Sequence, residues 1–485
     1  MPLTLDELNV SEKALWEAFA TGAAVDLRDS PERTVRATVL AALLLGAREV
    51  PPGSAPGVRL TGARITGDLR LTTAAITVPV LLEECDFDAE PNFDESSTRS
   101  LAFIRCRLPG FRGKLLRVDG QLRFNESTVT GCILLTRATI TGELVLVSAK
   151  LVNPGDWALF AGGLTVESAL FGAPNSDRPG AWPMTVEGGL RLVGARMLGG
   201  VFFDGVQIDN PGAVALQGDN MTIFGRMLCG QGFRSTGSVL MPRARVEGEL
   251  SFEGAHLDGP VALSLNNTII DDLNLRTAEP ATGLVDLRHA RCVLLRDAPV
   301  SWPAQIALDG FVYESIDSSP AYLAVKDRLR WLGREQDGFR PQPYEQLAVH
   351  YRRLGSDAAA RHVLLAKQRI QSRERQLHQR IAGHLLNWTV GYGYRPWRAA
   401  AWLAVMLAVG TIAFSAWPPQ PDGSTRKFDP LIYTLDLLLP ISAFGLREDF
   451  APVGSTRWLA YGLTAAGWLL ATALIAGVTR ALRRD

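Results

Sequence analysis

Hydrophobic and polar residues alternate with a period of two from about residue 57 to residue 315. An eleven-residue pattern recurs there: Ala-x-(Ile/Val/Leu)-x-Gly-x-(Leu/Val)-x-Leu-x-x. Clear copies begin at Ala63, Ala138, Ala195 and Ala244, and the match decays between them. This alternation predicts short strands with one buried face. No long helical pattern intervenes, so the strands are not expected to form βαβ units.

Repeats this short cannot bury a core alone and must stack on their neighbours. The glycine of the pattern predicts a bend, and the small alanine predicts a tight corner. We therefore expect a mainly β fold, a single-stranded parallel β-solenoid (β-helix) over residues 57–315, with roughly a dozen coils of two units each. A β-sandwich of glycine-rich hairpins is the competing interpretation. It explains less well why one motif recurs along the whole region.

Helical patterns flank the repeats on both sides. Residues 5–21 and 31–46 predict two helices in an N-terminal helical cap over 1–56, with Ser11 as a candidate N-cap. Residues 316–398 predict an α-helical neck. In the neck, apolar side chains recur at spacings of three and four, and a break is expected at Gly355-Ser356-Asp357.

Charge is distributed unevenly along the chain. The sequence has 50 Lys and Arg against 50 Asp and Glu, which argues against a general nucleic-acid-binding surface. The segment 361–398 nevertheless carries eight basic residues and one acid, Glu374. A solvated helix face is the ordinary explanation, but the next segment favours a membrane surface with anionic headgroups. The candidate residues for this contact are Lys367, Arg369, Arg373, Arg375, Arg380, Arg395 and Arg398.

Two C-terminal segments, 399–417 and 458–478, contain no charged residue. Each approaches the ~20 residues that cross a bilayer, and tryptophans cluster near their ends. They predict two transmembrane helices in a membrane hairpin over 399–485. The basic flanks predict a multi-pass protein of the plasma (inner) membrane with both termini cytoplasmic. Small residues at four-residue spacing suggest helix packing at Gly462, Ala466, Gly467 and Ala471.

Three further segments invite a functional interpretation. Residues 389–393 spell Thr-Val-Gly-Tyr-Gly, the potassium-channel filter, but they precede both predicted spans instead of lying between them. Residues 83–95 hold seven carboxylates, for which a solvated edge is more plausible than a cation site. Residues 431–444 form a mostly apolar run that is re-entrant or interfacial, and within it we expect Asp436 at the surface.

No motif for a metal, a cofactor or a catalytic residue is recognisable, so no cofactor is expected. The five cysteines are widely spaced without a Cys-x-x-Cys pair, which predicts free buried thiols.

Several segments resemble a group of actinobacterial membrane proteins. They are 58–67, 331–334, 341–348, 391–399 and 433–440. The resemblance covers nearly the whole chain, and members are often labelled membrane-associated oxidoreductase or pentapeptide-repeat-like. It implies the same fold, and it assigns no catalytic residue. Pentapeptide repeats have a period of five, whereas this chain has a period of eleven.

Three functions follow from these observations. The first is a membrane-anchored cytoplasmic scaffold that binds protein partners or associates with itself. The second is a membrane-associated oxidoreductase, as the resemblance implies. The third is a channel or pore-type effector in which the solenoid acts as a sensor.

Overall fold

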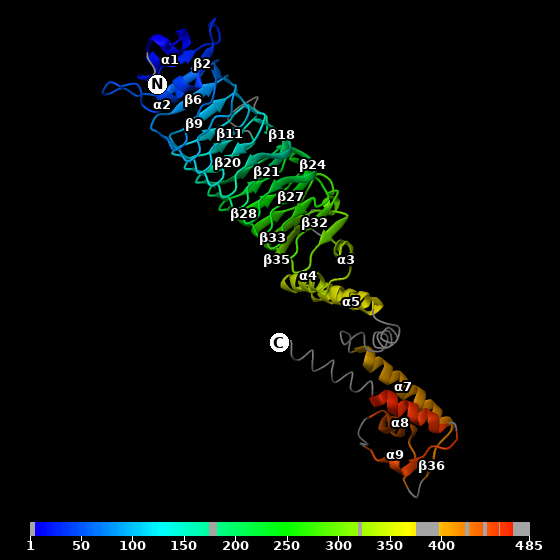
Figure 1. The fold of residues 1–485 in the computed structure, drawn as a ribbon. Helices are drawn as coiled ribbons and strands as arrows, with labels where there is room; N and C mark the ends of the chain where they lie inside the picture. The colour runs from blue at the N-terminus through cyan, green and yellow to red at the C-terminus, as the bar shows by residue number, and fades with distance from the viewer. Residues whose placement is uncertain are drawn as a thin grey trace. The chain divides into compact units, whose positions relative to one another are not determined.

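The computed structural model divides into two compact units, Met1–Ser356 and Asp357–Asp485, which are described separately (Figure 1). The residues that it describes are 5–173, 182–318, 323–374, 397–421, 426–439, 444–454 and 456–468.

The first unit is a parallel β-solenoid of about 12 turns. Two long sheets form its walls, and neighbouring strands within them pair in parallel (Figure 1). In one coil, β12 (Arg117–Val118) and β13 (Leu122–Arg123) lie in one sheet, while β14 (Thr128–Val129) and β15 (Ile133–Leu134) lie in the other. The predicted solenoid is confirmed. The sandwich of hairpins is wrong, because hairpins would pair their strands antiparallel.

The 20-stranded sheet contains β12, β13, β1 (Ala24–Asp26), β3 (Val58–Thr61), β5 (Ala75–Ile76), β6 (Val80–Glu83), β8 (Ser97–Thr98), β9 (Leu101–Ile104), β16 (Thr139–Ile140), β17 (Leu144–Val145), β19 (Thr165–Val166), β20 (Ala169–Phe171), β22 (Arg196–Met197), β23 (Gly200–Phe202), β25 (Thr222–Ile223), β26 (Met227–Leu228), β28 (Arg245–Ser251), β31 (Ile269–Asn274), β33 (Arg291–Asp297) and β35 (Val312–Ser318). The 15-stranded sheet contains β14, β15, β2 (Thr34–Arg36), β4 (Arg64–Thr66), β7 (Asp86–Phe87), β10 (Arg107–Leu108), β11 (Phe111–Arg112), β18 (Lys150–Phe160), β21 (Thr185–Arg191), β24 (Gln207–Gln217), β27 (Arg234–Leu240), β29 (His256–Asp258), β30 (Leu263–Ser264), β32 (Leu284–Asp286) and β34 (Gln305–Ala307).

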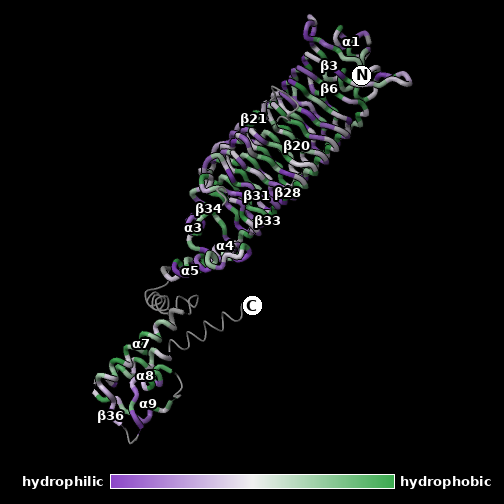
Figure 2. Tube along the Cα trace, turned by 180° about the vertical axis from the view of Figure 1, so that it is seen from behind, coloured by the Kyte–Doolittle hydropathy of each residue, from purple (hydrophilic) through white to green (hydrophobic). Residues whose placement is uncertain are grey.

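The core consists of apolar side chains stacked in register from coil to coil. Leu122 pairs with Leu144, and Leu144 pairs with Leu170; all three side chains are fully buried. The rings of Phe103 and Phe124 also stack, with centroids 5.2 Å apart. Each such side chain contributes roughly 1.5–3 kcal/mol by burial. Short hydrophilic and hydrophobic stretches accordingly alternate along the solenoid tube in Figure 2.

The corners of the coils differ from the prediction in one respect. The pattern's alanines are buried as expected. The residue just before them adopts the left-handed conformation: it is glycine before Ala63 and Ala195, but in other coils it is not glycine. Arg137 (φ +55°) before Ala138 and Ser148 (φ +57°) before Ala149 are examples. Of the pattern's glycines, Gly67 does have a positive φ, of +82°.

Other glycines allow neighbouring coils to approach closely. A Cβ atom on Gly225 would lie 2.8 Å from the carbonyl oxygen of Gly199, and one on Gly248 would lie 2.7 Å from that of Gly225. These three residues stack on one another, so a side chain at any of them meets the backbone of the coil beside it.

The N-terminal segment begins the solenoid as well as capping it. Strand β1 pairs with β3, and β2 pairs with β4, so the first coil starts before residue 57. A 3₁₀ turn at Leu5–Glu7 and the helices α1 (Val10–Phe19) and α2 (Ala37–Leu44) complete the cap.

Two predictions about the cap are wrong. The helix expected over 31–46 begins only at Ala37, because Thr34–Arg36 is held in the sheet. The N-cap of α1 is Asn9 instead of Ser11. The Asn9 Oδ1 atom accepts a hydrogen bond from the Glu12 amide at 2.8 Å, and the Asn9 amide donates to Glu12 Oε2 at 3.1 Å.

Helices close the C-terminal end of the solenoid. A 3₁₀ turn at Pro299–Ser301 precedes α3 (Val325–Leu332) and α4 (Pro341–Arg353). From α4, Gln342 donates to the Phe311 carbonyl oxygen at 3.1 Å and accepts from the Gly310 amide at 3.0 Å. Gln346 donates to the Tyr313 carbonyl oxygen at 2.6 Å. These glutamines therefore bond backbone groups of the last coil that would otherwise form an open sheet edge.

The second unit begins where the break was expected, after Gly355 (φ +72°). It contains α5 (Asp357–Glu374), α7 (Trp397–Ala416), α8 (Pro430–Leu438), α9 (Leu446–Asp449) and a further helical segment at 456–468. Strands β36 (Gln420–Pro421) and β37 (Phe450–Ala451) pair antiparallel. Among the residues described, no helix has both the length and the apolar character needed to cross a bilayer, so the predicted transmembrane hairpin is not observed.

Candidate functional site

The helices of the second unit enclose a small apolar core. Phe414 of α7 meets Tyr433 of α8 edge-on, with ring centroids 5.0 Å apart. Leu437 and Leu463 are buried in the same cluster. This core fixes which faces of α7 and of the 456–468 helix point outward.

Glycine allows two of these helices to approach α8. A Cβ atom on Gly410 of α7 would lie 2.3 Å from Thr434 Cγ2, and one on Gly467 would lie 2.3 Å from the Leu438 carbonyl oxygen. Gly467 was among the predicted packing residues, whereas Gly410 was missed because no small partner lies four residues from it.

The other predicted packing residues behave differently. Gly462 is exposed, with no atom within 4 Å of a Cβ placed there, so no helix among the described residues packs against it and its packing role stays a prediction. Ala466 is half-buried. Ala471 lies outside the residues that the structure describes.

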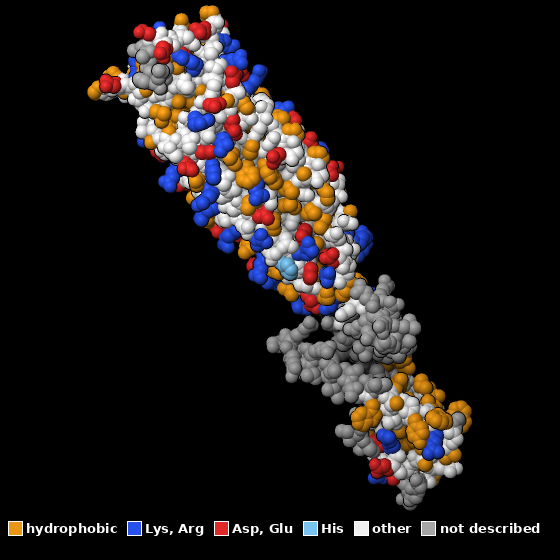
Figure 3. Space-filling model, viewed as in Figure 1, with side chains coloured by type: hydrophobic (Ala, Val, Ile, Leu, Met, Phe, Trp, Pro, Cys, Tyr) orange, Lys and Arg blue, Asp and Glu red, His pale blue; other side chains and the backbone are white. Residues whose placement is uncertain are grey.

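The outer face of α7 is apolar and exposed. Val405, Val409 and Ile412 are 50%, 51% and 69% exposed, and their spacing places them on one side of the helix. The tube in Figure 2 is strongly hydrophobic along α7 and α8, and Figure 3 shows hydrophobic side chains on the surface of this unit. A row of large apolar side chains in contact with water is unfavourable, so this face fits an apolar environment.

Aromatic residues extend the exposed apolar surface. Trp458, Tyr461 and Trp468 are all more than half exposed, and Trp458 reaches 79%. Arg457 Nε donates to the Tyr461 hydroxyl at 3.0 Å, and the guanidinium carbon lies 5.8 Å from the centre of the Tyr461 ring. A basic group therefore lies next to this exposed aromatic side chain. Tryptophan and tyrosine with a neighbouring basic residue are typical of the boundary between a bilayer and water.

The predicted basic residues are described only in part. Lys367 is half-buried and Arg369 is exposed on α5. Arg373 falls on the same helix, but its side chain is outside the description, as is that of Arg398 on α7. Arg375, Arg380 and Arg395 lie outside the described residues, as does the filter-like segment 389–393.

Asp436 is buried, so the prediction that it lies at the surface is wrong. Its side chain is fully enclosed, and its two oxygens accept from the amides of Phe444 (3.1 Å) and Arg447 (3.0 Å). The carboxylate therefore holds the turn that leads into α9. This structural role explains a buried acid in an apolar segment.

The acidic stretch at 83–95 forms ion pairs between coils. Arg112 lies 2.9 Å from Asp94, Arg64 lies 3.0 Å from Asp88, and Arg105 contacts Glu83 and Glu84. No cluster of three or more metal-binding side chains occurs in the described part of the chain. The stretch is thus an ion-paired edge of the solenoid. The feature of the sequence that could have indicated these ion pairs is the presence of arginines about one coil length after the acids.

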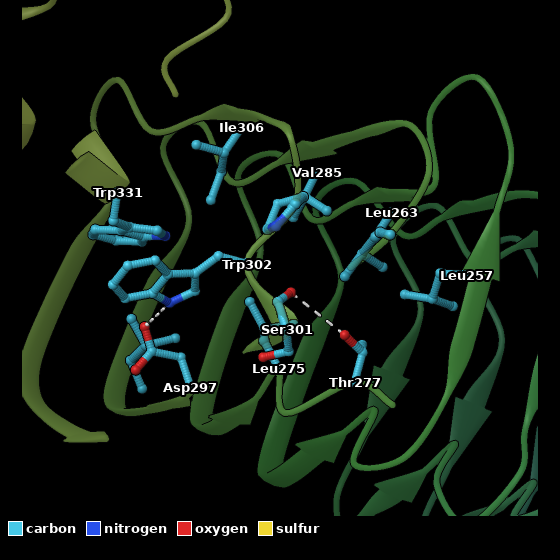
Figure 4. A pocket seen from close by; sticks show the side chains of 13 residues that line it. Leu257, Leu263, Leu275, Thr277, Val285, Asp297, Ser301, Trp302, Ile306 and Trp331 are labelled. Atoms are coloured by element: carbon cyan, nitrogen blue, oxygen red, sulfur yellow. Dashed lines mark hydrogen bonds between the residues drawn. The ribbon is translucent and has the colours of Figure 1, made fainter. Parts of the chain in front are cut away.

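A small cavity lies at the C-terminal end of the solenoid, with Asp297, Trp302 and Trp331 among the residues that line it (Figure 4). Asp297 also belongs to a buried ion pair. Arg328 of α3 donates to both oxygens of Asp297, at 2.5 and 2.8 Å, and both side chains are less than 5% exposed. Trp302 Nε1 also donates to Asp297 at 2.9 Å, and Trp331 lies over the guanidinium. The cavity, at about 20 Å³, has room for a water molecule.

The five cysteines are free, as predicted, and all but the half-buried Cys132 are buried. Burial raises the pKa of Cys132 to about 11 and raises those of Cys229 and Cys292 further. These thiols therefore stay protonated near neutral pH, and a protonated thiol is a poor nucleophile.

No family model, no curated protein and no solved structure matches this chain. The family suggested by its motifs therefore stays a prediction.

Proposed function

We propose that the protein is a membrane-attached scaffold, with a rigid β-solenoid that binds partners and a C-terminal unit that holds it at a bilayer. The observation that carries this proposal is the exposed apolar face of α7, with Val405, Val409 and Ile412 in one row. The charge-free segments 399–417 and 458–478 and the basic residues of 361–398 support it. Anionic lipids are the expected partner of those basic residues.

The solenoid supports the scaffold part of the proposal. Its core is stacked without interruption through about 12 turns, and helices cover both ends. The side chain of Asn9, the N-cap of α1, and side chains of α4 bond the terminal coils, so we infer that partners bind the flanks of the solenoid instead of its ends. Self-association, where it occurs, is expected through the same flanks.

No observation among the described residues favours the oxidoreductase or the channel alternative over the scaffold. The two cysteines that lie in hydrogen-bond contact, Cys85 and Cys106, are both buried and offer no redox pair at the surface, and the filter-like segment falls outside the description.

The membrane claim is tested by charging the α7 face in the full chain. We expect wild-type protein to stay in the membrane pellet after alkaline carbonate extraction. The triple variant Val405→Asp, Val409→Asp, Ile412→Asp should move largely to the supernatant, because each acid costs about 2.5–3.5 kcal/mol at bilayer depth. The matched control is Ile269→Asp, Val293→Asp, Val300→Asp, which charges three exposed apolar positions of the solenoid and should stay in the pellet. Recovery of the wild-type protein in the supernatant would contradict the proposed membrane attachment.

A further inference from the structure

A hollow lies on the outer face of the 20-stranded sheet, over β13, β17 and β20. It offers about 170 Å³ to solvent, far more than the small cavity at the end of the solenoid. Its lining residues are Gln121, Arg123, Asn125, Glu143, Val145, Val147 and Phe171. The floor is apolar, whereas the rim carries amide, guanidinium and carboxylate groups.

The register of the sheet explains the hollow. Arg123, Val145, Phe171 and Phe202 follow one another in line on consecutive coils. The rings of Phe171 and Phe202 are stacked, with centroids 4.9 Å apart and planes at 11°. The opposite side of the Phe171 ring faces the coil of Val145, whose short side chain leaves the space above it open. A slot therefore lies between an aromatic ring and a guanidinium.

The width of the slot indicates the shape of its ligand. Arg123 and Phe171 are two coils apart, so their backbones are separated by about 9.6 Å at ~4.8 Å per coil, which limits the width of the slot. A flat ring in contact with both walls would need only ~7–8 Å, at 3.5–4.0 Å per contact. A puckered sugar ring is thicker than a flat aromatic ring, so it fills the space that a flat ring would leave between the two walls. Its apolar C–H face also suits the phenyl ring and the valine floor.

The polar rim is arranged for hydroxyl groups. Gln121 Nε2 donates to Glu143 at 2.9 Å, and Arg123 Nε donates to the Asn125 side-chain oxygen at 3.3 Å, so these groups are held in place. Asn125 is only 2% exposed as a whole residue, and its side-chain oxygen accepts from Arg123. Its side-chain nitrogen is a donor at the rim of the hollow, and a ligand hydroxyl can accept from it in place of water. One arginine and one glutamate balance in charge, which favours a neutral ligand.

We propose that this hollow binds one pyranose ring of a neutral saccharide, between Phe171 and Arg123 over Val145, with a hydroxyl accepting from Asn125. The proposal goes beyond the scaffold function and does not depend on how the C-terminal unit is held.

The test is saturation-transfer NMR on the full chain in a detergent without sugar groups, with maltose, cellobiose, N-acetylglucosamine and adenosine as probes at millimolar concentration. We expect transfer to the ring C–H protons of at least one saccharide and none to adenosine. Val145→Phe should abolish binding by filling the slot. Leu228→Phe is the matched control, because it extends the same aromatic row at its other end, next to Phe202, and should leave binding unchanged.

Asn125→Ala should weaken saccharide binding about tenfold, which corresponds to one lost hydrogen bond of about 1.4 kcal/mol. Circular dichroism of each variant checks that the solenoid remains folded. The proposal is overturned if no saccharide binds the wild-type chain, if adenosine binds in preference to all of them, or if folded Val145→Phe binds as well as wild type.

Discussion

At the scale of single residues, the corners of the coils determine how closely the solenoid stacks. Glycine is needed at Gly225 because the coil on one side approaches within contact distance of where a Cβ would lie, not because φ is positive. Some left-handed corners are glycine, such as Gly62 and Gly194, whereas others are ordinary residues such as Arg137, each of which carries a modest conformational cost.

We expect Gly225→Ala to destabilise the solenoid by about 1–3 kcal/mol, because the added methyl group must push two coils apart. Gly162→Ala is the control. Its φ is not in the left-handed region, and its Cβ would meet only the Val193 carbonyl oxygen, at an ordinary 3.8 Å. Thermal unfolding of the two variants measures the difference, and equal melting temperatures would show that coil spacing does not depend on this glycine.

At the scale of elements, α3 closes the solenoid through a charge pair that it inserts into the last coils. Arg328 reaches Asp297 between Trp302 and Trp331, where water is largely excluded. Buried pairs of this kind are costly to break from one side, because the remaining charge stays buried.

Asp297→Ala should therefore cost about 3–5 kcal/mol in the stability of the C-terminal coils. The control Asp272→Ala removes the partner of the part-exposed Arg296 and should cost no more than about 1 kcal/mol. Hydrogen exchange of the α3 amides measures both effects. The double variant Asp297→Leu, Arg328→Met should regain much of the loss, and a double variant as unstable as the single one would contradict this explanation.

The period of the sequence predicted the strands, the stacked core and the alanine corners, because each follows from burial of one strand face. It did not predict the ion pairs of the acidic stretch. Arg105 and Arg112 lie beside Glu84 and Asp94 on the neighbouring coil, and these pairs can be assigned only when the number of residues per coil is known. The exposed apolar face of α7 lies within a segment that the sequence already marked by its absence of charge, whereas its contact with a membrane stays a prediction.

The hollow could not be predicted from any single repeat. It depends on three successive coils placing a large, a small and a charged side chain in one row, and insertions between the copies hide that register. An insertion at Asn153-Pro154-Gly155 recurs as Asn210-Pro211-Gly212. In both, the asparagine side chain donates to a backbone carbonyl four residues on, at 2.9 Å.

At the scale of the whole molecule, the chain combines two units with different surfaces. The solenoid carries ion-paired charges on its flanks, whereas the second unit exposes a row of aliphatic and aromatic side chains. The difference in surface chemistry is what the proposed scaffold function, with binding in one unit and attachment in the other, requires.

The most direct test of the proposed membrane attachment separates the two units in a membrane preparation. A specific protease sequence inserted after Gly355, where the chain turns between the units, allows cleavage of the full chain in isolated membranes. We predict that the fragment ending near residue 356 is released into the supernatant with the circular dichroism of a β-protein, while the fragment containing 357–485 stays in the pellet. Release of both fragments together would contradict a membrane attachment through the second unit.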